Sequence, residues 1–355
     1  MVDRYLSDKL KVISFFSMIM VVFLHSYNLE ENILQDPNIT KGYNFLVQFF
    51  ISQGLARIAV PIFFIISGYL LFLNKNYTSN EYFLILKKRL KSLVIPYLFW
   101  SCLLFVVFFL LQSLPQTATF FKQKHIVNYT FTEVLQAIFI YPIPFQLWFV
   151  RDLFILIVFS PLFYIFIKYA KNLLLLILLI TWWFQFDFII FSNEAILFFT
   201  LGGTFAVKKL DLNIQMFSKI SILLLFLWVF IILSETILVY KGILNKNILN
   251  SIHKSGILVG IVAIWSFYDF LLLKTKIINS ILISLTQTSF FIYVCHEPLL
   301  EILKIVSYKI FGSSQFLKLI VYFTIPLLII PIFILLGFWF KKNASNFFSI
   351  VTGGR

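Results

Sequence analysis

Four places in this sequence carry side chains that could do chemistry, and each lies in or beside a strongly apolar stretch. The side chains are those of His25, Arg57, Arg151, Asp152, His296 and Glu297. An imidazole can take up a proton near physiological pH or act as a nucleophile. A guanidinium group can stabilise a developing anion, and carboxylates can orient an imidazole or bind hydroxyl groups. The same residues could also line the substrate site of a transporter.

Each of these residues also has a plainer explanation. A histidine at the end of an apolar stretch is often only interfacial, and Arg151-Asp152 could be a local pair that neutralises itself. Arg57 is harder to explain in this way, because it lies deep in its stretch and has no acid nearby in sequence. Pro61 follows four residues later and has no N–H, so it frees the carbonyl of Arg57 and predicts a kink there. A buried arginine beside a helix break is a candidate functional residue.

The composition decides which elements must position these side chains. The chain has 355 residues, of which 61% are hydrophobic, 12% are charged and 46 are phenylalanine, and its mean hydropathy is +0.95. Soluble domains are about 45–50% apolar and about 25% charged. A soluble globular fold, a disordered chain and a disulfide scaffold are therefore excluded. The sequence predicts an all-α integral membrane protein, because its apolar runs are too long and uniform for barrel strands.

About ten stretches are long and apolar enough to be membrane-spanning helices. They lie near 11–28, 46–73, 92–112, 147–167, 172–190, 194–207, 217–240, 255–273, 277–300 and 316–340. No cleavage site follows the first stretch, so we expect a retained helix and not a signal peptide. Neither a soluble domain nor a linker is evident, which predicts one transmembrane domain over residues 1–355. The longest segment between stretches, 113–146, is expected on the outer side.

The basic residues predict the orientation. With the N-terminus inside, more of the 29 lysines and arginines fall on inner than on outer segments, which favours both termini in the cytoplasm. This distribution also explains the net charge of +14 without a nucleic-acid partner. His25 is then about 21 Å along its helix from Lys11, near the outer boundary. Arg57, Glu194 and Glu235 are expected at similar depth, which predicts a polar cavity that opens outward.

A basic run, formed by Lys87, Lys88, Arg89 and Lys91, precedes the third stretch on the inner side. It could be an ordinary topological anchor that also attracts anionic lipid. It could equally bind the phosphates of a nucleotide-like donor. Cys102 and Cys295 are expected at opposite faces, too far apart for a disulfide. The few histidines and cysteines show no spacing typical of metal ligands.

Five segments together resemble the membrane-bound acyltransferase 3 family, whose members acylate bacterial surface glycans. The resemblance lies in residues 15–25, 60–71, 88–97, 147–153 and 289–299, which occur in the order of the family. It implies that His25 is the essential histidine of the first helix and that the basic run lies on the acyl-CoA side. This chain departs from the family at Ser14 and Ser92, where relatives usually carry arginine. Lys11, one turn before Ser14, is on nearly the same helical face as His25.

With this resemblance, the sequence predicts a membrane O-acyltransferase of the bacterial inner membrane. Acetyl-CoA is the expected donor substrate, no cofactor is expected to be bound, and the acceptor is expected to be a hydroxyl of a surface or lipid-linked polysaccharide. His25 would act as base or covalent carrier, and Arg57 and Arg151 would bind the oxyanion or the acceptor. Asp152, His296 and Glu297 would orient the histidine or bind sugar hydroxyls. The alternative is a glycan transporter without acyl-transfer chemistry, although no inverted repeat is evident.

Overall fold

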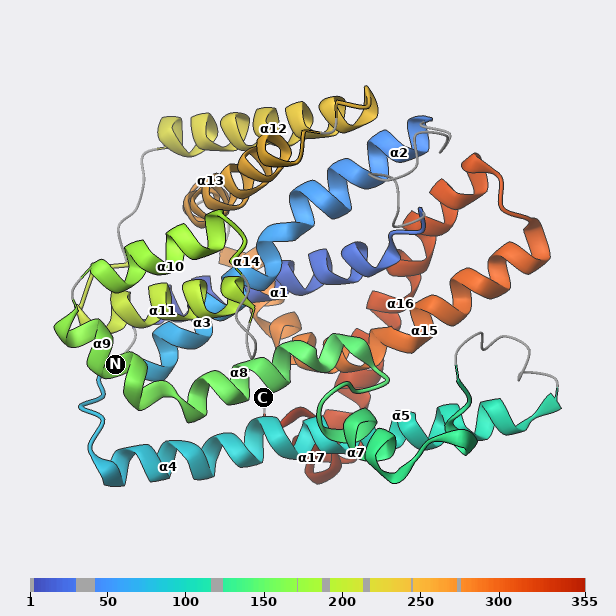
Figure 1. Ribbon diagram of the computed structural model, residues 1–355, viewed down its shortest axis with the longest axis horizontal. Coiled ribbons are helices and arrows are strands. Elements are labelled where there is room, and N and C mark those ends of the chain that lie inside the picture. The colour runs from blue at the N-terminus through green and yellow to red at the C-terminus, as the bar shows by residue number, and fades with distance from the viewer. Residues whose placement is uncertain are drawn as a thin grey trace. The chain divides into compact units, whose positions relative to one another are not determined.

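The computed structural model describes residues 3–29, 42–115, 124–170, 172–186, 192–212, 218–243, 245–272 and 276–354 (Figure 1). Within these ranges every regular element is a helix, so the all-α class is confirmed. Contacts between Cα atoms divide the chain into two compact units, which are described separately. The first unit comprises Met1–Lys75 and Leu162–Ile334, and the second comprises Asn76–Pro161 and Leu335–Arg355. The expected single domain over 1–355 stays a prediction.

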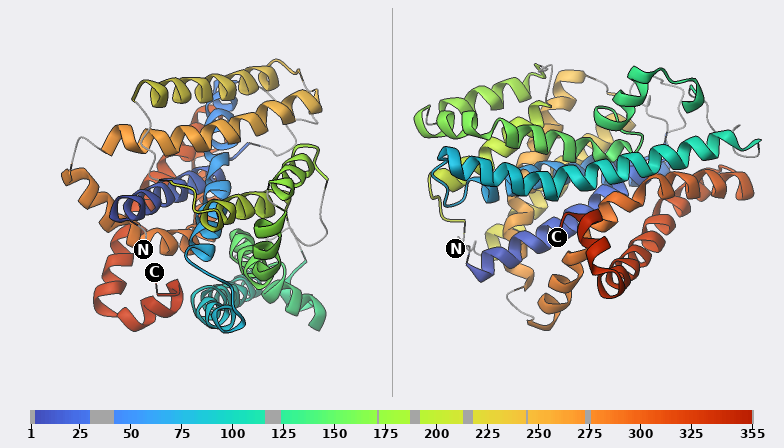
Figure 2. Two further views of the ribbon diagram at one scale, coloured as in Figure 1. Left: turned by 90° about the vertical axis from the view of Figure 1, so that its left-hand side faces the viewer. Right: turned by 90° about the horizontal axis from the view of Figure 1, so that it is seen from below.

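The first unit contains most of the long helices. Its elements are α1 (Arg4–Ser26), α2 (Tyr43–Gln48), η2 (Phe49–Gly54), η3 (Leu55–Ile58), α3 (Ala59–Phe72), α10 (Leu173–Trp183), α11 (Asn193–Val207), α12 (Ser218–Tyr240), α13 (Lys246–Leu272), α14 (Lys276–Leu285), η7 (Thr286–Thr288) and α15 (Ser289–Phe311). α12 and α13 lie side by side and run in opposite directions (Figure 2). α1 contacts α3, α13, α14 and α15, so the helix that ends beside His25 is surrounded by much of this unit.

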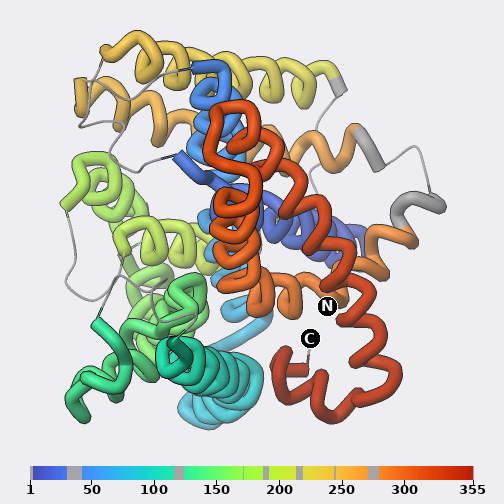
Figure 3. Tube along the Cα trace, turned by 90° about the vertical axis from the view of Figure 1, so that its right-hand side faces the viewer, coloured from blue at the N-terminus to red at the C-terminus, as the bar shows by residue number. Residues whose placement is uncertain are grey.

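The second unit is built around one long helical run. Its elements are α4 (Ser79–Arg89), η4 (Leu90–Val94), α5 (Ile95–Ser113), η5 (Ile126–Asn128), α7 (Phe131–Phe139), η6 (Phe145–Leu147), α8 (Trp148–Val158) and α17 (Ser345–Thr352). Two helices cross the boundary between the units, α9 (Ser160–Tyr169) and α16 (Gln315–Asn343). After α15 the chain reverses at Gly312, whose positive φ of 86° suits glycine, and continues into α16 (Figure 3).

Six described helical runs are long and apolar enough to cross a membrane, and the bent pair α8–α9 would make a seventh. The six are α1, the α2–α3 run, the α4–α5 run, α12, α13 and α16. The protein is therefore a multi-pass membrane protein. The number ten and the cytoplasmic termini stay predictions. The ends of three expected stretches, at 187–190, 217 and 273, and part of the expected outer segment, at 116–123, lie outside the described residues.

Two stretches that were expected to be single helices are broken. The stretch 147–167 bends by 62° between α8 and α9, next to Pro161, whose ring cannot donate to the preceding turn. The stretch 277–300 is interrupted at η7, where the hydroxyls of Thr286 and Thr288 donate to the carbonyls of Ile283 and Leu285 over 2.8 Å. Such bonds compete with the helical backbone pattern. Hydropathy alone does not register these local hydrogen bonds, which is why the breaks were missed.

The predicted departure from α-helix at Arg57 is confirmed. Between α2 and α3 the backbone forms a π-helical turn, η2, and then a 3-10 turn, η3, which contains Arg57. Pro61 lies in the first turn of α3, so the carbonyl of Arg57 has no N–H four residues later. Irregular turns of this kind often occur at functional sites.

Close packing of α3 on α11 explains the paired glycines in the sixth stretch. A Cβ on Gly202 would lie 2.0 Å from the Ile65 carbonyl oxygen, and one on Gly68 would lie 2.1 Å from that of Phe199. Only glycine permits the two backbones to approach so closely. Gly202-Gly203 thus serves helix packing.

Candidate functional site

The predicted histidines of two distant segments meet in the first unit. Nδ1 of His25, at the end of α1, lies 2.8 Å from Nε2 of His296, in α15. The two rings are stacked, with centroids 5.1 Å apart and planes inclined by 18°. His296 is completely buried, whereas His25 is partly exposed. The structure therefore places the first-helix histidine on a buried imidazole partner.

The surroundings of His296 determine which nitrogen of His25 carries the proton. Nδ1 of His296 lies 3.2 Å from the carbonyl oxygen of Ile292, and a carbonyl can only accept. In a neutral ring Nε2 of His296 must then accept, so Nδ1–H of His25 donates to it. With both rings neutral, Nε2 of His25 carries the lone pair. This is the nitrogen that can take a proton or attack a carbonyl.

Arg57 is in electrostatic range of His25 but does not pair with a carboxylate. The charges of Glu194, in α11, and Glu235, in α12, both act on Arg57, and Arg57 in turn acts on His25. Within the described residues, however, its guanidinium donates to Gln53, one turn earlier, with Nε 2.8 Å from the amide oxygen. Arg57 is thus a partly exposed cation in electrostatic range of both His25 and the two acids, Glu194 and Glu235.

An imidazole–carboxylate pair lies between α12 and α13. Nδ1 of His253 is 3.0 Å from the carboxylate of Glu235, which is 6% exposed. The next residue, Lys254, is also buried and donates to the carbonyls of Trp182 and Trp183, the latter over 2.9 Å. Glu194 is in electrostatic range of His253 and Lys254.

Comparison with known proteins identifies the family. The acyltransferase 3 pattern, described as an acyltransferase domain, matches residues 9–342. The chain belongs to this family. The succinoglycan biosynthesis protein ExoH of Rhizobium meliloti (strain 1021) is 28% identical over 311 residues, which cover 86% of this chain and 81% of that protein. No solved structure matches the chain.

The protein is therefore a membrane acyltransferase, and the predicted resemblance is confirmed. Family membership favours an enzyme over the alternative of a transporter without acyl-transfer chemistry. Among the described residues, no three histidine, cysteine, aspartate or glutamate side chains form a group that could hold a metal ion. Cys102 and Cys295 are both free thiols, as expected.

Glu297 is buried beside His296 in the acyltransferase. Its backbone is extended, with φ of −104° and ψ of 139°, and it interrupts α15 directly before Pro298. This break lies within the ninth expected stretch. α15 resumes after the break and continues to Phe311, well past the expected end at residue 300. Lys304 and Glu301, on the following turns, are in electrostatic range of Glu297.

Arg151 and Asp152, in α8, form a local ion pair. This was the plainer explanation for two charged residues in an apolar stretch. The Arg151 guanidinium lies 2.7 Å from the Asp152 carboxylate, which is buried, and it also donates to the carbonyl of Ile140. Both residues belong to the second unit. Their proposed roles in binding the acceptor or orienting His25 stay predictions.

The basic run of the acyltransferase lies on α4 and η4 of the second unit. Lys87, Lys88 and Lys91 are exposed, whereas Arg89 is partly buried and in electrostatic range of Tyr77. α4 starts at a capping box formed by Thr78 and Glu81. An exposed basic helix fits both the anchor and the phosphate-binding explanation.

Several buried charges were missed at the sequence level. Lys304 lies 3.2 Å from the His25 carbonyl oxygen and 2.6 Å from Glu301. His253 was not singled out. The sequence carries no clear signal for either, because both lie just outside the expected stretches 255–273 and 277–300, and α13 and α15 extend beyond those limits.

The buried cation at the start of α1 is Lys9 and not Lys11. Lys9 is 1% exposed, lies 2.7 Å from Asp269 in α13, and stacks 4.3 Å above the Trp265 ring. Lys11 is half exposed and pairs with Asp8 over 3.6 Å. A lysine that faces away from the packed side is a poor substitute for the arginine of relatives.

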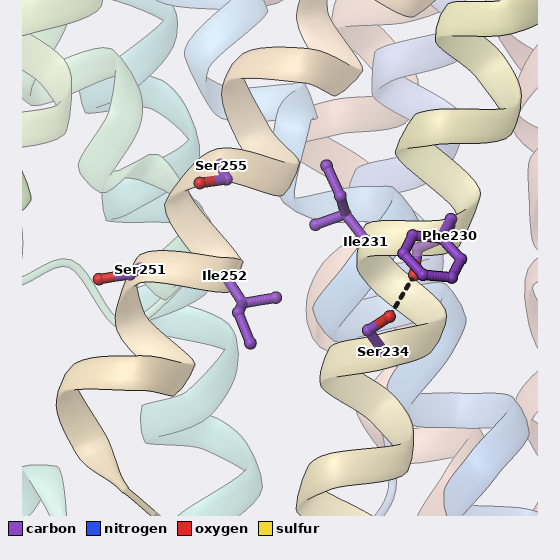
Figure 4. Close-up of a pocket in the computed structure, with 6 residues that line it drawn as sticks. All are labelled: Phe230, Ile231, Ser234, Ser251, Ile252 and Ser255. Atoms are coloured by element: carbon purple, nitrogen blue, oxygen red, sulfur yellow. Dashed lines mark hydrogen bonds between the residues drawn. The ribbon is translucent and has the colours of Figure 1, made fainter.

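The pocket between α12 and α13 is separate from these charged groups. It has a volume of about 400 Å³ and is lined by Phe230, Ile231, Ser234, Ser251, Ile252 and Ser255 (Figure 4). The Ser234 hydroxyl donates a hydrogen bond to the Phe230 carbonyl. His253 lies about 200° around α13 from Ser251 and thus on the opposite side of that helix. The pocket contains no titratable side chain, so we do not assign the chemistry to it.

Proposed function

We propose that this acyltransferase moves an acetyl group from cytoplasmic acetyl-CoA to a hydroxyl of a surface or lipid-linked polysaccharide, with His25 at the reacting centre. The family supports the acyl transfer, and the name of the ExoH relative, a succinoglycan biosynthesis protein, supports a polysaccharide acceptor. The single observation that carries the role of His25 is its hydrogen bond to His296. The protein would act in the bacterial inner membrane, with both termini in the cytoplasm.

In the general-base route, Nε2 of His25 takes the proton of the acceptor hydroxyl as its oxygen attacks the thioester carbonyl. The resulting oxyanion is stabilised by the positive charge of Arg57. When the tetrahedral intermediate collapses, the C–S bond breaks and the proton passes from His25 to the CoA thiolate. One ester is formed, one thioester is consumed and His25 returns to its starting state.

In the covalent route, Nε2 of His25 first attacks the thioester carbonyl and CoA leaves as the thiolate. The acceptor hydroxyl then attacks the acyl-imidazole, the C–N bond to His25 breaks, and the hydroxyl proton is released to solvent. The CoA thiolate takes up one proton from solvent, so one ester and one thiol are formed and neutral His25 is restored. Both routes require an unprotonated Nε2. The covalent route separates the donor and acceptor steps, which suits substrates that arrive from opposite sides of the membrane.

The other predicted residues have supporting roles in this proposal. Lys87, Lys88, Arg89 and Lys91 would bind the phosphates of CoA. Arg151 and Asp152 would contact the acceptor, and Glu297 would help to orient the reacting imidazole. Donor and acceptor are substrates, and the proposal needs no metal ion.

The proposal is tested by replacing His25. Purified protein in detergent receives acetyl-CoA and the host's surface polysaccharide after mild alkaline removal of its ester groups. We expect His25→Ala to lower the rate of polysaccharide acetylation by about 10²–10⁴-fold, because that is the usual contribution of a general base. His125→Ala, on the exposed segment before η5, is the matched control and should keep the parent rate. A well-folded His25→Ala protein that acetylates at the parent rate would exclude both routes.

A further inference from the structure

Arg57 and four ionisable side chains of α11, α12 and α13 form a set that is linked by electrostatic interactions and one hydrogen bond. Arg57 makes no ion pair with a carboxylate of the described residues. The set comprises Arg57, Glu194, Glu235, His253 and Lys254. The only carboxylate pairing within it is the bond between Glu235 and His253, over 3.0 Å. Glu194 is in electrostatic range of Lys254, and Lys254 donates to backbone carbonyls. The guanidinium of Arg57 contacts Gln53.

A purely structural network in an apolar surrounding would bring opposite charges into contact. Each charge inside a bilayer costs at least about 2.5–3.5 kcal/mol, and a close partner offsets part of that cost. Glu194 and Glu235 both act electrostatically on Arg57, yet Arg57 bonds a neutral amide. Arg57 and the two glutamates are therefore close enough to interact electrostatically, but they form no direct ion pair. This is the arrangement expected around a polar ligand that bridges them.

The charges of the set also indicate which ligand fits. Arg57 and Lys254 are positive and Glu194 and Glu235 are negative, so their formal charges cancel. An anionic ligand such as a diphosphate would be opposed by the two carboxylates, and a cationic ligand by the two bases. A neutral polyol suits all of them, because each hydroxyl can donate to a carboxylate and accept from a guanidinium.

We propose that Arg57, Glu194, Glu235 and His253 form the subsite that binds the hydroxyl groups of a neutral sugar residue of the acceptor. This inference rests on the proposed function for its acceptor, and it adds residues from α11, α12 and α13 to the site. Arg57 then connects the two parts of the site, since it is in electrostatic range of both His25 and the two glutamates.

The Glu235–His253 pair gives the subsite a defined set of hydrogen-bonding groups. The Glu235 carboxylate can only accept, so Nδ1 of His253 donates to it and Nε2 of the neutral ring is an acceptor. Nε2 can therefore receive a sugar hydroxyl, while the second oxygen of Glu235 can receive another. The subsite thus offers acceptors from α12 and α13 and donors from Arg57.

The first experiment measures binding and does not depend on catalysis. Oligosaccharides are released from the host's de-esterified surface polysaccharide, and their Kd for purified protein is measured in detergent. Glu194→Gln and Glu235→Gln should each weaken binding by about 10–100-fold, because a hydrogen bond from a neutral group to a charged acceptor contributes about 1.5–3 kcal/mol. Glu133→Gln, on exposed α7, is the control and should bind as the parent does.

A charge test accompanies the binding measurement. Oxidation of the primary hydroxyls of the same oligosaccharides to carboxylates gives an anionic probe of almost unchanged size. The parent should bind this probe at least 10-fold more weakly than the neutral form. The Glu194→Gln/Glu235→Gln protein should lose this preference, because the repelling carboxylates are gone. Equal binding of both probes by the parent would overturn the assignment of a neutral ligand.

Kinetics separate this inference from the proposed function. In the acetylation assay, Glu194→Gln and Glu235→Gln should raise the KM for polysaccharide by at least 10-fold and change the KM for acetyl-CoA by less than threefold. Unchanged Kd and KM for polysaccharide in both variants would overturn the subsite. If the parent binds the oligosaccharides through these glutamates but transfers no acetyl group, the proposed function fails and the subsite stands. Glu194→Asp and Glu235→Asp keep the charge, so they replace any glutamine variant that does not purify as a folded protein.

Discussion

At the scale of single residues, the contact between His25 and His296 changes what the first-helix histidine can do. A histidine at a helix end is commonly interfacial. Here the chain of bonds from the Ile292 carbonyl through His296 places the proton of neutral His25 on Nδ1. The buried imidazole therefore has the role that a carboxylate has in other histidine-dependent transferases and hydrolases.

We expect replacement of His296 to change the tautomer of His25. The protein has four histidines, so selective ¹⁵N-imidazole labelling gives a spectrum simple enough to assign. His25 should carry its proton on Nδ1 in the parent and in His296→Gln, whose amide oxygen can accept the same bond. In His296→Leu it should shift towards the Nε2–H form, and kcat should fall about 10²-fold with little change in the KM for the donor. An Nε2–H tautomer of His25 in the parent would contradict this account.

The Lys9–Asp269 pair is a second feature at the residue scale, and it concerns stability. Both side chains are 1% exposed, and the Asp269 carboxylate also receives the Tyr5 hydroxyl. The pair joins the first turns of α1 to the last turns of α13.

We expect Lys9→Met alone to destabilise the protein by about 3–5 kcal/mol, because it leaves a buried carboxylate without its cation. The double variant Lys9→Met/Asp269→Leu should recover most of this loss, since it removes both charges together. Thermal unfolding in detergent measures the effect. Strictly additive losses in the double variant would show that the two side chains do not act as a pair.

At the scale of elements, irregular backbone accompanies two of the candidate site residues. Arg57 lies in a 3-10 turn and Glu297 in an extended break of α15. Regular helices carry the bulk apolar side chains outward, as α12 does with Leu223, Phe226 and Phe230, which are 67–70% exposed in the protein and suited to lipid contact. The same helix buries Trp228 and Ile232 on its packed side.

The prediction about the donor concerns the exposed lysines of α4 and η4. If these lysines bind CoA phosphates, the variant Lys87→Gln/Lys88→Gln/Lys91→Gln should raise the KM for acetyl-CoA by about 10-fold. The KM of the parent should rise with salt, and that of the variant should depend on salt much less. Lys219→Gln, at the start of α12, is the matched control. A correctly inserted triple variant with parent donor kinetics would identify the run as a topological anchor only.

At the scale of the whole molecule, sidedness governs how donor and acceptor meet. The proposed function requires the basic run to face the cytoplasm and the segment around α7 to face outward. In a protein without Cys102 and Cys295, we expect a cysteine replacing Lys124 to react with an impermeant reagent in intact cells. A cysteine replacing Lys88 should react only after permeabilisation. The reverse pattern would place the basic run away from cytoplasmic CoA and contradict the proposed route.

The sequence by itself determined the class of the protein and much of its helical framework. Hydrophobicity is a local property, and a helix in lipid satisfies its own backbone, so each apolar stretch indicates a helix without knowledge of its neighbours. α11 and α12 accordingly begin and end near their expected limits, and α1 and α3 end near theirs, although α1 begins earlier and α3 later than expected. The chemistry of Pro61 is local too, and it was sufficient to predict the irregular turn at Arg57. The order of the five family segments indicated the acyltransferase family.

Only the tertiary structure decided which polar residues meet. His25 and His296 are 271 positions apart, and Lys9 and Asp269 are 260 apart. No periodicity relates such positions, because helix packing in a membrane is set by side-chain shape and close backbone approach and not by hydrophobic pattern. For this reason His253, Lys254 and Lys304 appeared in the sequence as ordinary charges near helix ends. Packing places them near acids and imidazoles that are distant in sequence, and it buries Lys254 and Lys304.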